Sequence, residues 1–261
     1  EDIISHSYPS VQADAQISDT IEMLKDYAED SIPVLNPSNE IIGIITSQDI
    51  IEAVDDEMGE DYAKLAGLTA EEDLDEKLGE SIKKRMPWLI LLLGLGLVTS
   101  SVIGLFDTVV AAMAVLVIFQ SLILDMAGNV GTQSLAVTIR VLMDEDVSGR
   151  EKAAFVFKEV RIGGTNGLIL GAFAIVFIAI YLHAMKGYLW FAAFQISTIV
   201  GFSLFVAMMI SSLVGTIIPM FFHKIKVDPA VASGPLITTV NDMVAVVTYY
   251  GLAGILLLGR I

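Results

Sequence analysis

Asp242 is the only charged residue in the apolar stretch Pro235–Leu258. A stretch of roughly 20 apolar residues is long enough to cross a bilayer as a helix. A carboxylate at that depth is costly, and such groups usually face a bundle interior or a water-filled path, where they bind cations or relay protons. Asp242 is therefore a candidate ligand in an ion pathway. The alternative is a structural acid that hydrogen-bonds to a neighbouring helix or extends its carboxylate to the membrane surface.

A second polar site interrupts another apolar stretch, which begins at Val109. The interruption contains Asp125, Gly128, Asn129, Gly131 and Gln133. Two glycines are typical of close helix packing in membranes, whereas amides and a carboxylate need partners that lipid does not offer. Pore lining and polar contacts between helices are equally supported by this segment.

The charge distribution separates two parts of the chain. The net charge is −16; most of the 31 acids lie in residues 1–80, and most of the 15 lysines and arginines lie in residues 81–261. This division indicates an acidic soluble piece joined to a membrane piece. The chain has no cysteine, which excludes disulfides and thiolate sites. Because it opens at Glu1 without a leader pattern, we expect the C-terminal part, or a shortened form, of a longer protein.

Five apolar stretches predict five membrane-spanning helices. Most basic residues lie on one side of these stretches, and only Lys186 and Arg260 lie on the other. The excess of positive charge predicts a cytoplasmic N-terminus and an external C-terminus in the plasma or inner membrane. The expected spans are Pro87–Phe106, Val109–Leu124 with a continuation to Leu142, Ile162–Leu182, Trp190–Phe222 and Pro235–Leu258.

The acidic piece has the pattern of a small α/β domain. Short apolar runs alternate with capped helical patterns, and the acids after Val54 are followed by a segment that changes from acidic to basic. The expected elements are a helix at Ile21–Ala28, strands at Ile32–Leu35 and Glu40–Thr46, a helix at Gln48–Val54 capped by Ser47, and a helix over residues 71–86.

Five segments of the chain match a known pattern: Gly43–Asp49, Glu60–Leu65, Gly128–Ser134, Lys158–Gly163 and Asp228–Asp242. In these segments the chain resembles the MgtE family of magnesium channels. The resemblance implies a multi-domain membrane protein. Its parts would be a second CBS unit (α/β) at residues 1–54, an acidic linker and connecting (plug) helix at 55–86, and an all-α pore domain of five transmembrane helices at 87–261.

The same resemblance implies a homodimer with one central pore for Mg²⁺. Asp242 of each subunit would face a shared ion site, with Thr238 one turn earlier and Asn166 approaching from the third span. Mg²⁺ gives up its waters reluctantly, so carboxylates would select charge while retained waters set the size. For Thr238 and Asn166 the alternative is ordinary hydrogen bonding between helices.

The resemblance also assigns a regulatory role to the acidic piece. Acids there would bind intracellular Mg²⁺ and favour a closed pore by cancelling charge repulsion. Asp49 is also where a CBS unit contacts a ribose, so ATP would be a ligand of a complete CBS pair. The regulatory candidates are Asp49, Glu52, Glu57, Glu60, Asp61, Asp228 and Glu159.

The expected function is therefore Mg²⁺ uptake through a gated, Mg²⁺-selective channel. The alternatives are a carrier coupled to Na⁺ or H⁺, a transporter of other divalent ions such as Co²⁺ or Mn²⁺, and a CBS-regulated scaffold that transports nothing. We do not expect an enzyme or a nucleic-acid partner, since the sequence contains neither a nucleophile–base pattern nor a basic nucleic-acid patch.

Overall fold

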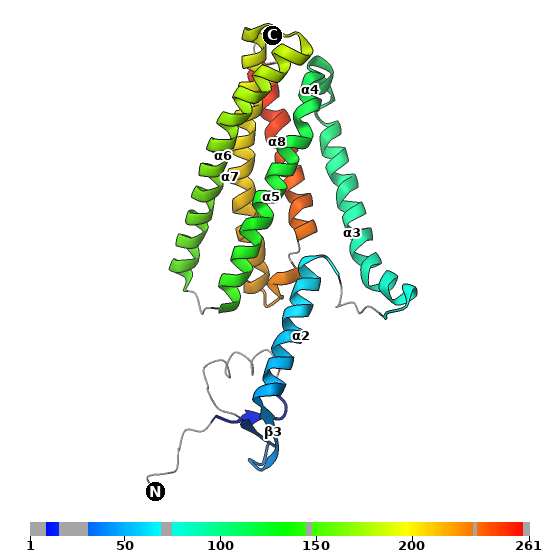
Figure 1. Ribbon diagram of the computed structural model, residues 1–261, viewed down its shortest axis with the longest axis vertical. Helices are drawn as coiled ribbons and strands as arrows, with labels where there is room; N and C mark the ends of the chain where they lie inside the picture. The colour runs from blue at the N-terminus through cyan, green and yellow to red at the C-terminus, as the bar shows by residue number, and fades with distance from the viewer. Residues whose placement is uncertain (1–8, 16–30, 69–74, 145–147, 232–233, 258–261) are drawn as a thin grey trace. The chain divides into compact units, whose positions relative to one another are not determined.

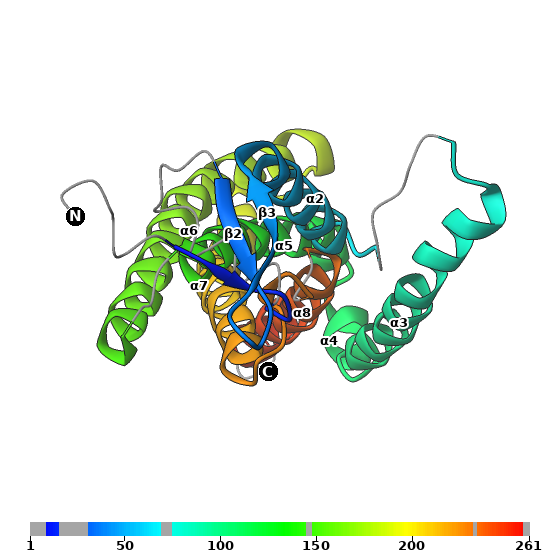
Figure 2. The ribbon, with the colours of Figure 1, turned by 90° about the horizontal axis from the view of Figure 1, so that it is seen from below.

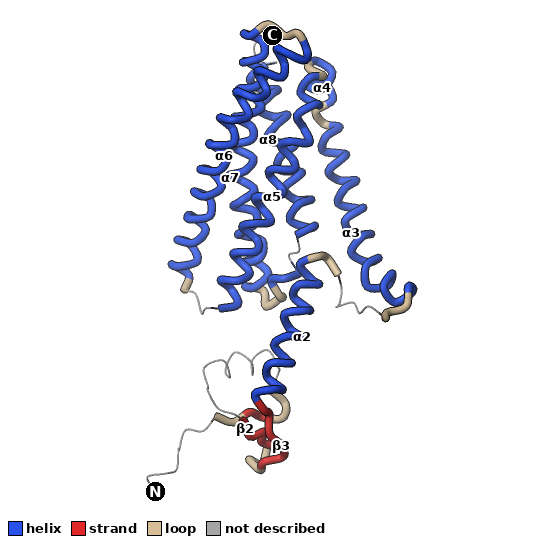
Figure 3. The backbone as a smooth tube through the Cα atoms, in the orientation of Figure 1, coloured by secondary structure: helices blue, strands red, loops and turns tan. Residues whose placement is uncertain are grey.

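The computed structural model describes residues 9–15, 31–68, 75–144, 148–231 and 234–257 (Figure 1). The chain divides into two compact units, Glu1–Ala63 and Lys64–Ile261. Strands occur in the first unit and the long helices in the second, as the backbone trace shows (Figure 3). An α/β region followed by a helical body confirms the predicted fold class.

The first unit contains a three-stranded sheet with the order β1-β2-β3. Strand β1 (Val11–Gln12) pairs in parallel with β2 (Ser31–Leu35), which pairs antiparallel with β3 (Ile41–Thr46). Val11 and Ile32 form its small buried core. Both expected strands are thus present, whereas the expected helix Ile21–Ala28 lies outside the described residues.

Helix α2 (Ser47–Leu65) is longer than the sequence pattern predicted. The expected end at Val54 was wrong, because the acids that follow lie on exposed faces of a helix that continues. The expected cap at Ser47 was also wrong: Thr46 caps the helix and pairs reciprocally with Asp49. The order of charges suits the helix dipole, with Asp49 in the first turn and Lys64 in the last.

A tight turn follows α2 and leads toward the first span. Gly67 has φ +81°, and a Cβ there would lie 2.3 Å from Trp88 Cδ1, so only glycine fits beneath that ring. The expected single helix over 71–86 was wrong within the described residues, since 75–77 are not helical. Helix α3 (Leu78–Gly104) instead begins ahead of the basic residues Lys83–Arg85 and continues without a break through the first span.

Among the described residues, five helices are long and apolar enough to cross a membrane, which confirms the predicted number. After α3 come α5 (Val115–Asp144), α6 (Gly149–Lys186), α7 (Trp190–Lys224) and α8 (Gly234–Leu257). Two short elements join them: helix α4 (Asp107–Ala112) and the 3₁₀ turn η1 (Pro229–Val231). The second span therefore starts later than expected, because extended backbone at Met113 (φ −141°, ψ 71°) separates α4 from α5.

Helix α7 is the centre of the bundle and α3 its margin. In the most apolar 18-residue window of each helix, 44% of the α7 residues are buried, against 6% of the α3 residues. Helices α5, α6 and α8 all pack on α7, whereas α3 packs on α8. Figure 2 shows α3 to the side of the other spans. Glycines allow the closest approaches: a Cβ at Gly171 would lie 2.6 Å from the Gly201 carbonyl oxygen.

Candidate functional site

A groove of about 350 Å³ lies between α5 and α8. It brings together five of the residues that the sequence singled out, from segments more than 100 positions apart. Both helices contribute polar oxygens, which are the ligands that hydrated Mg²⁺ and similar hard cations prefer. The lining residues are Ser121, Leu124, Asp125, Gly128 and Asn129 of α5, with Thr238 and Asp242 of α8.

Small residues set the distance between these two helices. A Cβ at Gly128 would lie 3.0 Å from Thr238 Cγ2, and one at Gly131 would lie 1.7 Å from Asn241 Nδ2. Thr132 Oγ1 donates to the Gly128 carbonyl at 2.9 Å and lies 3.5 Å from Thr238 Oγ1. The glycines of this segment therefore serve packing, and its Asp and Asn side chains line the groove. Pore lining by this segment stays a prediction.

Two tyrosines hold α8 against the N-terminal part of α5. The Tyr249 hydroxyl donates to the Leu116 carbonyl at 2.8 Å, and the Tyr250 hydroxyl donates to Gln120 Oε1 at 2.6 Å. Both rings are fully buried. Because these bonds tie the helices two turns from Asp242, the groove is part of a rigid contact.

Helix α5 exposes a polar stripe along this face. Ser121, Asp125, Asn129 and Gln133 are four positions apart and all exposed, and Asp242 beside them is half-buried. Polar side chains are expensive against lipid, so such a stripe needs a polar or protein surround. The stripe extends the groove along α5 to Gln133, which is not itself a lining residue.

Asn241 is a residue that sequence reasoning missed. It is fully buried, and neither its Oδ1 nor its Nδ2 has a hydrogen-bond partner among the described residues. Its position beside Asp242, four residues after Ile237 on the same helix face, was visible in the sequence. The contact with Gly131 was not, since it requires knowing which helices pair.

Glu159 lies in a closed contact of α5, α6 and α7. It is 5% exposed, and Oε2 is 3.1 Å from the hydroxyl of Ser134, which donates to it. Ser212 lies 2.8 Å from the same hydroxyl and donates to the backbone carbonyl of Glu159. The structure thus places Glu159 within the bundle, with two serines that the sequence analysis did not identify. Its regulatory role stays a prediction.

Asn166 lies in a different groove, on α6, with Lys158 and Arg161. Within one chain it does not line the groove that holds Asp242 and Thr238. Its assignment to the pore ion site stays a prediction.

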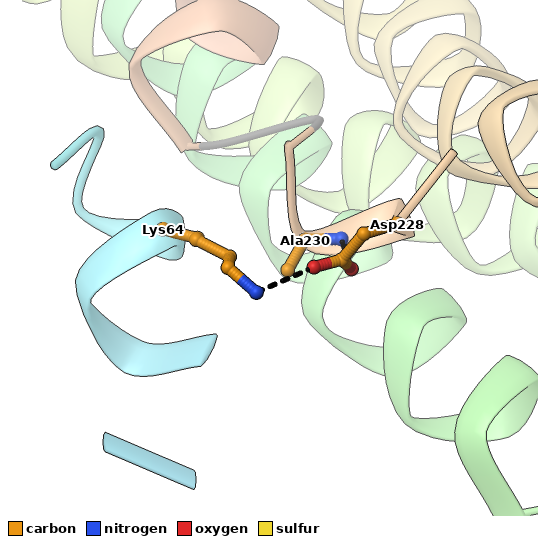
Figure 4. Close-up of polar contacts among 3 residues, drawn as sticks. All are labelled: Lys64, Asp228 and Ala230. Carbon is orange, nitrogen blue, oxygen red and sulfur yellow. Dashed lines mark hydrogen bonds and ion pairs between the residues drawn. The ribbon is translucent and has the colours of Figure 1, made fainter. Parts of the chain in front are cut away.

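Asp228 joins the end of α2 to the segment before α8 (Figure 4). Its Oδ1 accepts from the backbone N–H of Ala230 at 2.8 Å, and its Oδ2 pairs with Lys64 Nζ at 2.8 Å. The first bond begins the η1 turn, and the second crosses 164 positions of sequence. Lys64 was not predicted, since a lysine in the last turn of a helix usually serves only the dipole.

The acids of α2 are spread along the helix. Asp49, Glu52 and Glu60 are exposed and Asp61 is half-buried, while the side chain of Glu57 lies outside the described residues. The Thr46 hydroxyl, and next the Thr46 backbone N–H, hydrogen-bond the Asp49 carboxylate and hold its pKa below the usual range. Over the described parts of the chain, no three acidic or histidine side chains gather into a metal site.

Comparison with known proteins identifies the family of this membrane unit. Residues 120–252, which include both Asp125 and Asp242, match the MgtE family, described as divalent cation transporters. The chain belongs to the MgtE family. Residues 1–56 match the CBS domain, so the MgtE bundle is a multi-pass membrane unit that follows a CBS unit.

Three MgtE relatives are similar to the chain over most of its length. It is 37% identical to the magnesium transporter MgtE of Bacillus subtilis over 85% of the chain and 48% of that protein. For the proteins of the same name from Enterococcus faecalis and Thermus thermophilus, identity is 34% over 97% of the chain and 28% over 95%, covering 53% of each. The chain thus spans about half the length of these relatives.

Proposed function

We propose that the chain forms the pore and part of the regulatory region of a Mg²⁺ channel. The observation that carries the proposal is the groove in which Asp242 and Thr238 of α8 meet Asp125 and Asn129 of α5. Carboxylates select positive charge, and neutral oxygens hold the waters that Mg²⁺ retains. The relatives named magnesium transporters support Mg²⁺ as the transported ion.

The channel is a homodimer in this proposal. Its support is the exposed polar stripe of Ser121, Asp125, Asn129 and Gln133, which lipid would leave unsolvated. A second copy facing the first across a two-fold axis would enclose the stripe in a water-filled path. Asp242 of both copies would then act on one ion.

Transport is tested by Mg²⁺ flux into proteoliposomes without a Na⁺ or pH gradient. Asp242→Asn abolishes flux if the carboxylate binds the ion, and Asp107→Asn, the same change at exposed Asp107 outside the groove, leaves flux unchanged. Undiminished flux in Asp242→Asn overturns the site. Flux that appears only when a Na⁺ or H⁺ gradient is imposed replaces the channel with a coupled carrier.

The dimer is tested by disulfide cross-linking, which the absence of native cysteine makes unambiguous. Asn129→Cys, on the stripe, forms a covalent dimer on oxidation in liposomes. Phe177→Cys, which replaces an exposed side chain on α6, does not. Equal cross-linking of both variants, or of neither, contradicts an interface through α5.

Gating by intracellular Mg²⁺ is the regulatory part of the proposal. It is supported by the continuity of α2, a single helix that carries Glu52, Glu60 and Asp61 and ends next to the Lys64–Asp228 pair. Bound Mg²⁺ would reduce repulsion among these acids and favour the closed state. A variant with Glu60→Gln and Asp61→Asn should keep conducting when Mg²⁺ is high on the side of the acidic unit. Inhibition equal to that of the wild type contradicts this role.

A further inference from the structure

A groove of about 460 Å³ runs along the outer face of α6, away from the groove that holds Asp242. Two of its lining residues are basic, and none of the described residues that line it is acidic. All of them belong to one helix, which packs on α7 with its other face. The lining residues are Ala154, Phe157, Lys158, Arg161, Ile162, Thr165 and Asn166.

The two basic residues lie at the depth of the lipid headgroups. The apolar part of α6, Ile162–Leu182, measures about 30 Å at 1.5 Å per residue, which matches the hydrocarbon core. Arg161 directly precedes this segment and Lys158 lies one turn earlier. Both side chains are exposed. Their charges therefore meet the headgroup layer and not the acyl chains.

An apolar strip continues from the groove into the membrane. Leu168, Ile169 and Val176 follow Arg161 and Thr165 at helical spacing and are 63%, 50% and 50% exposed. Exposed side chains of this kind pack against acyl chains. A soluble anion would use only the basic end, whereas a phospholipid would contact both the basic end and the strip.

The basic end is ordered before any ligand arrives. The Arg161 guanidinium lies 5.8 Å from the centre of the Phe157 ring, a cation–π contact that restricts the arginine. Phe157 is 65% exposed, as expected of an aromatic residue at a membrane interface. The Thr165 hydroxyl donates to the Arg161 carbonyl at 2.8 Å, so it supports the backbone.

We propose that this groove binds the headgroup of an anionic phospholipid. The phosphate lies between Lys158 Nζ and the Arg161 guanidinium, and the acyl chains run along Leu168 and Ile169. Arginine suits phosphate because its planar fork donates two parallel hydrogen bonds, and lysine adds a mobile positive charge. Anionic lipids are attracted to basic groups at this depth, and basic pockets beside spans hold their headgroups.

The test is native mass spectrometry of the full chain extracted from mixed phosphatidylglycerol and phosphatidylcholine vesicles. The wild type should retain phosphatidylglycerol. A double variant, Lys158→Gln with Arg161→Gln, should retain about 25-fold less, or roughly fivefold per charge. The single variant Lys158→Arg keeps the positive charge and should retain phosphatidylglycerol like the wild type.

A matched control separates the groove from a general effect of charge. Lys224→Gln with Lys226→Asn removes two exposed charges at the same end of the bundle, and asparagine tolerates the φ of +59° at position 226. This control should bind phosphatidylglycerol like the wild type. An equal loss in both double variants, unchanged retention in the Lys158 and Arg161 variant, or displacement of the lipid by inorganic phosphate alone would each overturn the proposal.

Discussion

Asp242 and Glu159 are two carboxylates of one helical bundle in opposite surroundings. Asp242 is half-buried in an open groove with a second carboxylate, Asp125, across from it. Glu159 is buried and its carboxylate accepts a hydrogen bond from Ser134, while its backbone carbonyl accepts one from Ser212. A partnered acid stabilises a contact, whereas an acid left facing a groove is available to a cation. The difference supports the proposed ion site at Asp242 and predicts that Glu159 mainly stabilises the bundle.

The largest expected effect is on transport. Asp242→Asn should abolish Mg²⁺ flux, because a neutral amide does not compensate a divalent charge. Glu159→Gln keeps a polar group of the same size in the closed contact and should lower flux less than about threefold. Isotope or dye uptake into proteoliposomes measures both. Equal losses in the two variants would remove the distinction between the two surroundings.

Alanine substitutions of the glycines near each carboxylate should differ in their effect on the free energy of unfolding. Gly163→Ala places a Cβ 2.5 Å from Ser212 Cβ and 3.0 Å from the Met208 carbonyl oxygen, so α6 and α7 must separate at a cost of about 1–3 kcal/mol. Gly128→Ala meets the Thr238 side chain, with Cγ2 nearest at 3.0 Å and no backbone atom among the near contacts, and should cost less. Denaturant unfolding in detergent compares them, with Gly96→Ala, which meets nothing within 4 Å, as the control. If Gly128→Ala destabilises the protein more than Gly163→Ala does, the contact around Glu159 is not the more tightly packed of the two.

Loss of the hydrogen bond from Ser134 to Glu159 should destabilise the protein less than the Gly163→Ala substitution does. Ser134→Ala leaves the buried Oε2 without its donor and should cost about 1–2 kcal/mol in the same unfolding assay. Ser121→Ala, on the same helix, removes an exposed hydroxyl in the groove and should stay within about 0.5 kcal/mol. If the two substitutions have the same effect, then the hydrogen bond to Glu159 contributes nothing to the fold.

The smallest effect concerns a third carboxylate, outside the bundle. The Thr46 hydroxyl and backbone N–H lower the pKa of Asp49, so its ionised form stabilises the start of α2. A lowered pKa gives stability that is present above the unfolded value, near pH 3.9, and lost as pH falls through the folded pKa. Hydrogen exchange at the start of α2 should therefore rise below about pH 4 in the wild type. Asp49→Asn should exchange faster at neutral pH, with no such acid-dependent step.

The sequence predicts the spans well and their contacts poorly. Length and hydropathy are properties of one segment, so the five membrane helices followed from composition alone. The groove needs α5 paired with α8, and no local pattern shows that Gly131 meets Asn241 or that Lys64 reaches Asp228. The predicted end of α2 was wrong for a related reason. The acids after Val54 suggest a linker, but they sit on solvated faces of α2, where repulsion is screened by water.

The slight burial of α3 has a consequence for how the protein is made. Among the five spans α3 leaves the ribosome first, and α8, on which it packs, is synthesised last. During the synthesis of the three spans between them, α3 has to stay in the bilayer without α8, held by the mean hydropathy of 2.0 in its most apolar window. Stable insertion before helix association is the first of two stages in membrane-protein assembly. A polar substitution on α3 should therefore reduce the yield of inserted protein more than the stability of the finished bundle.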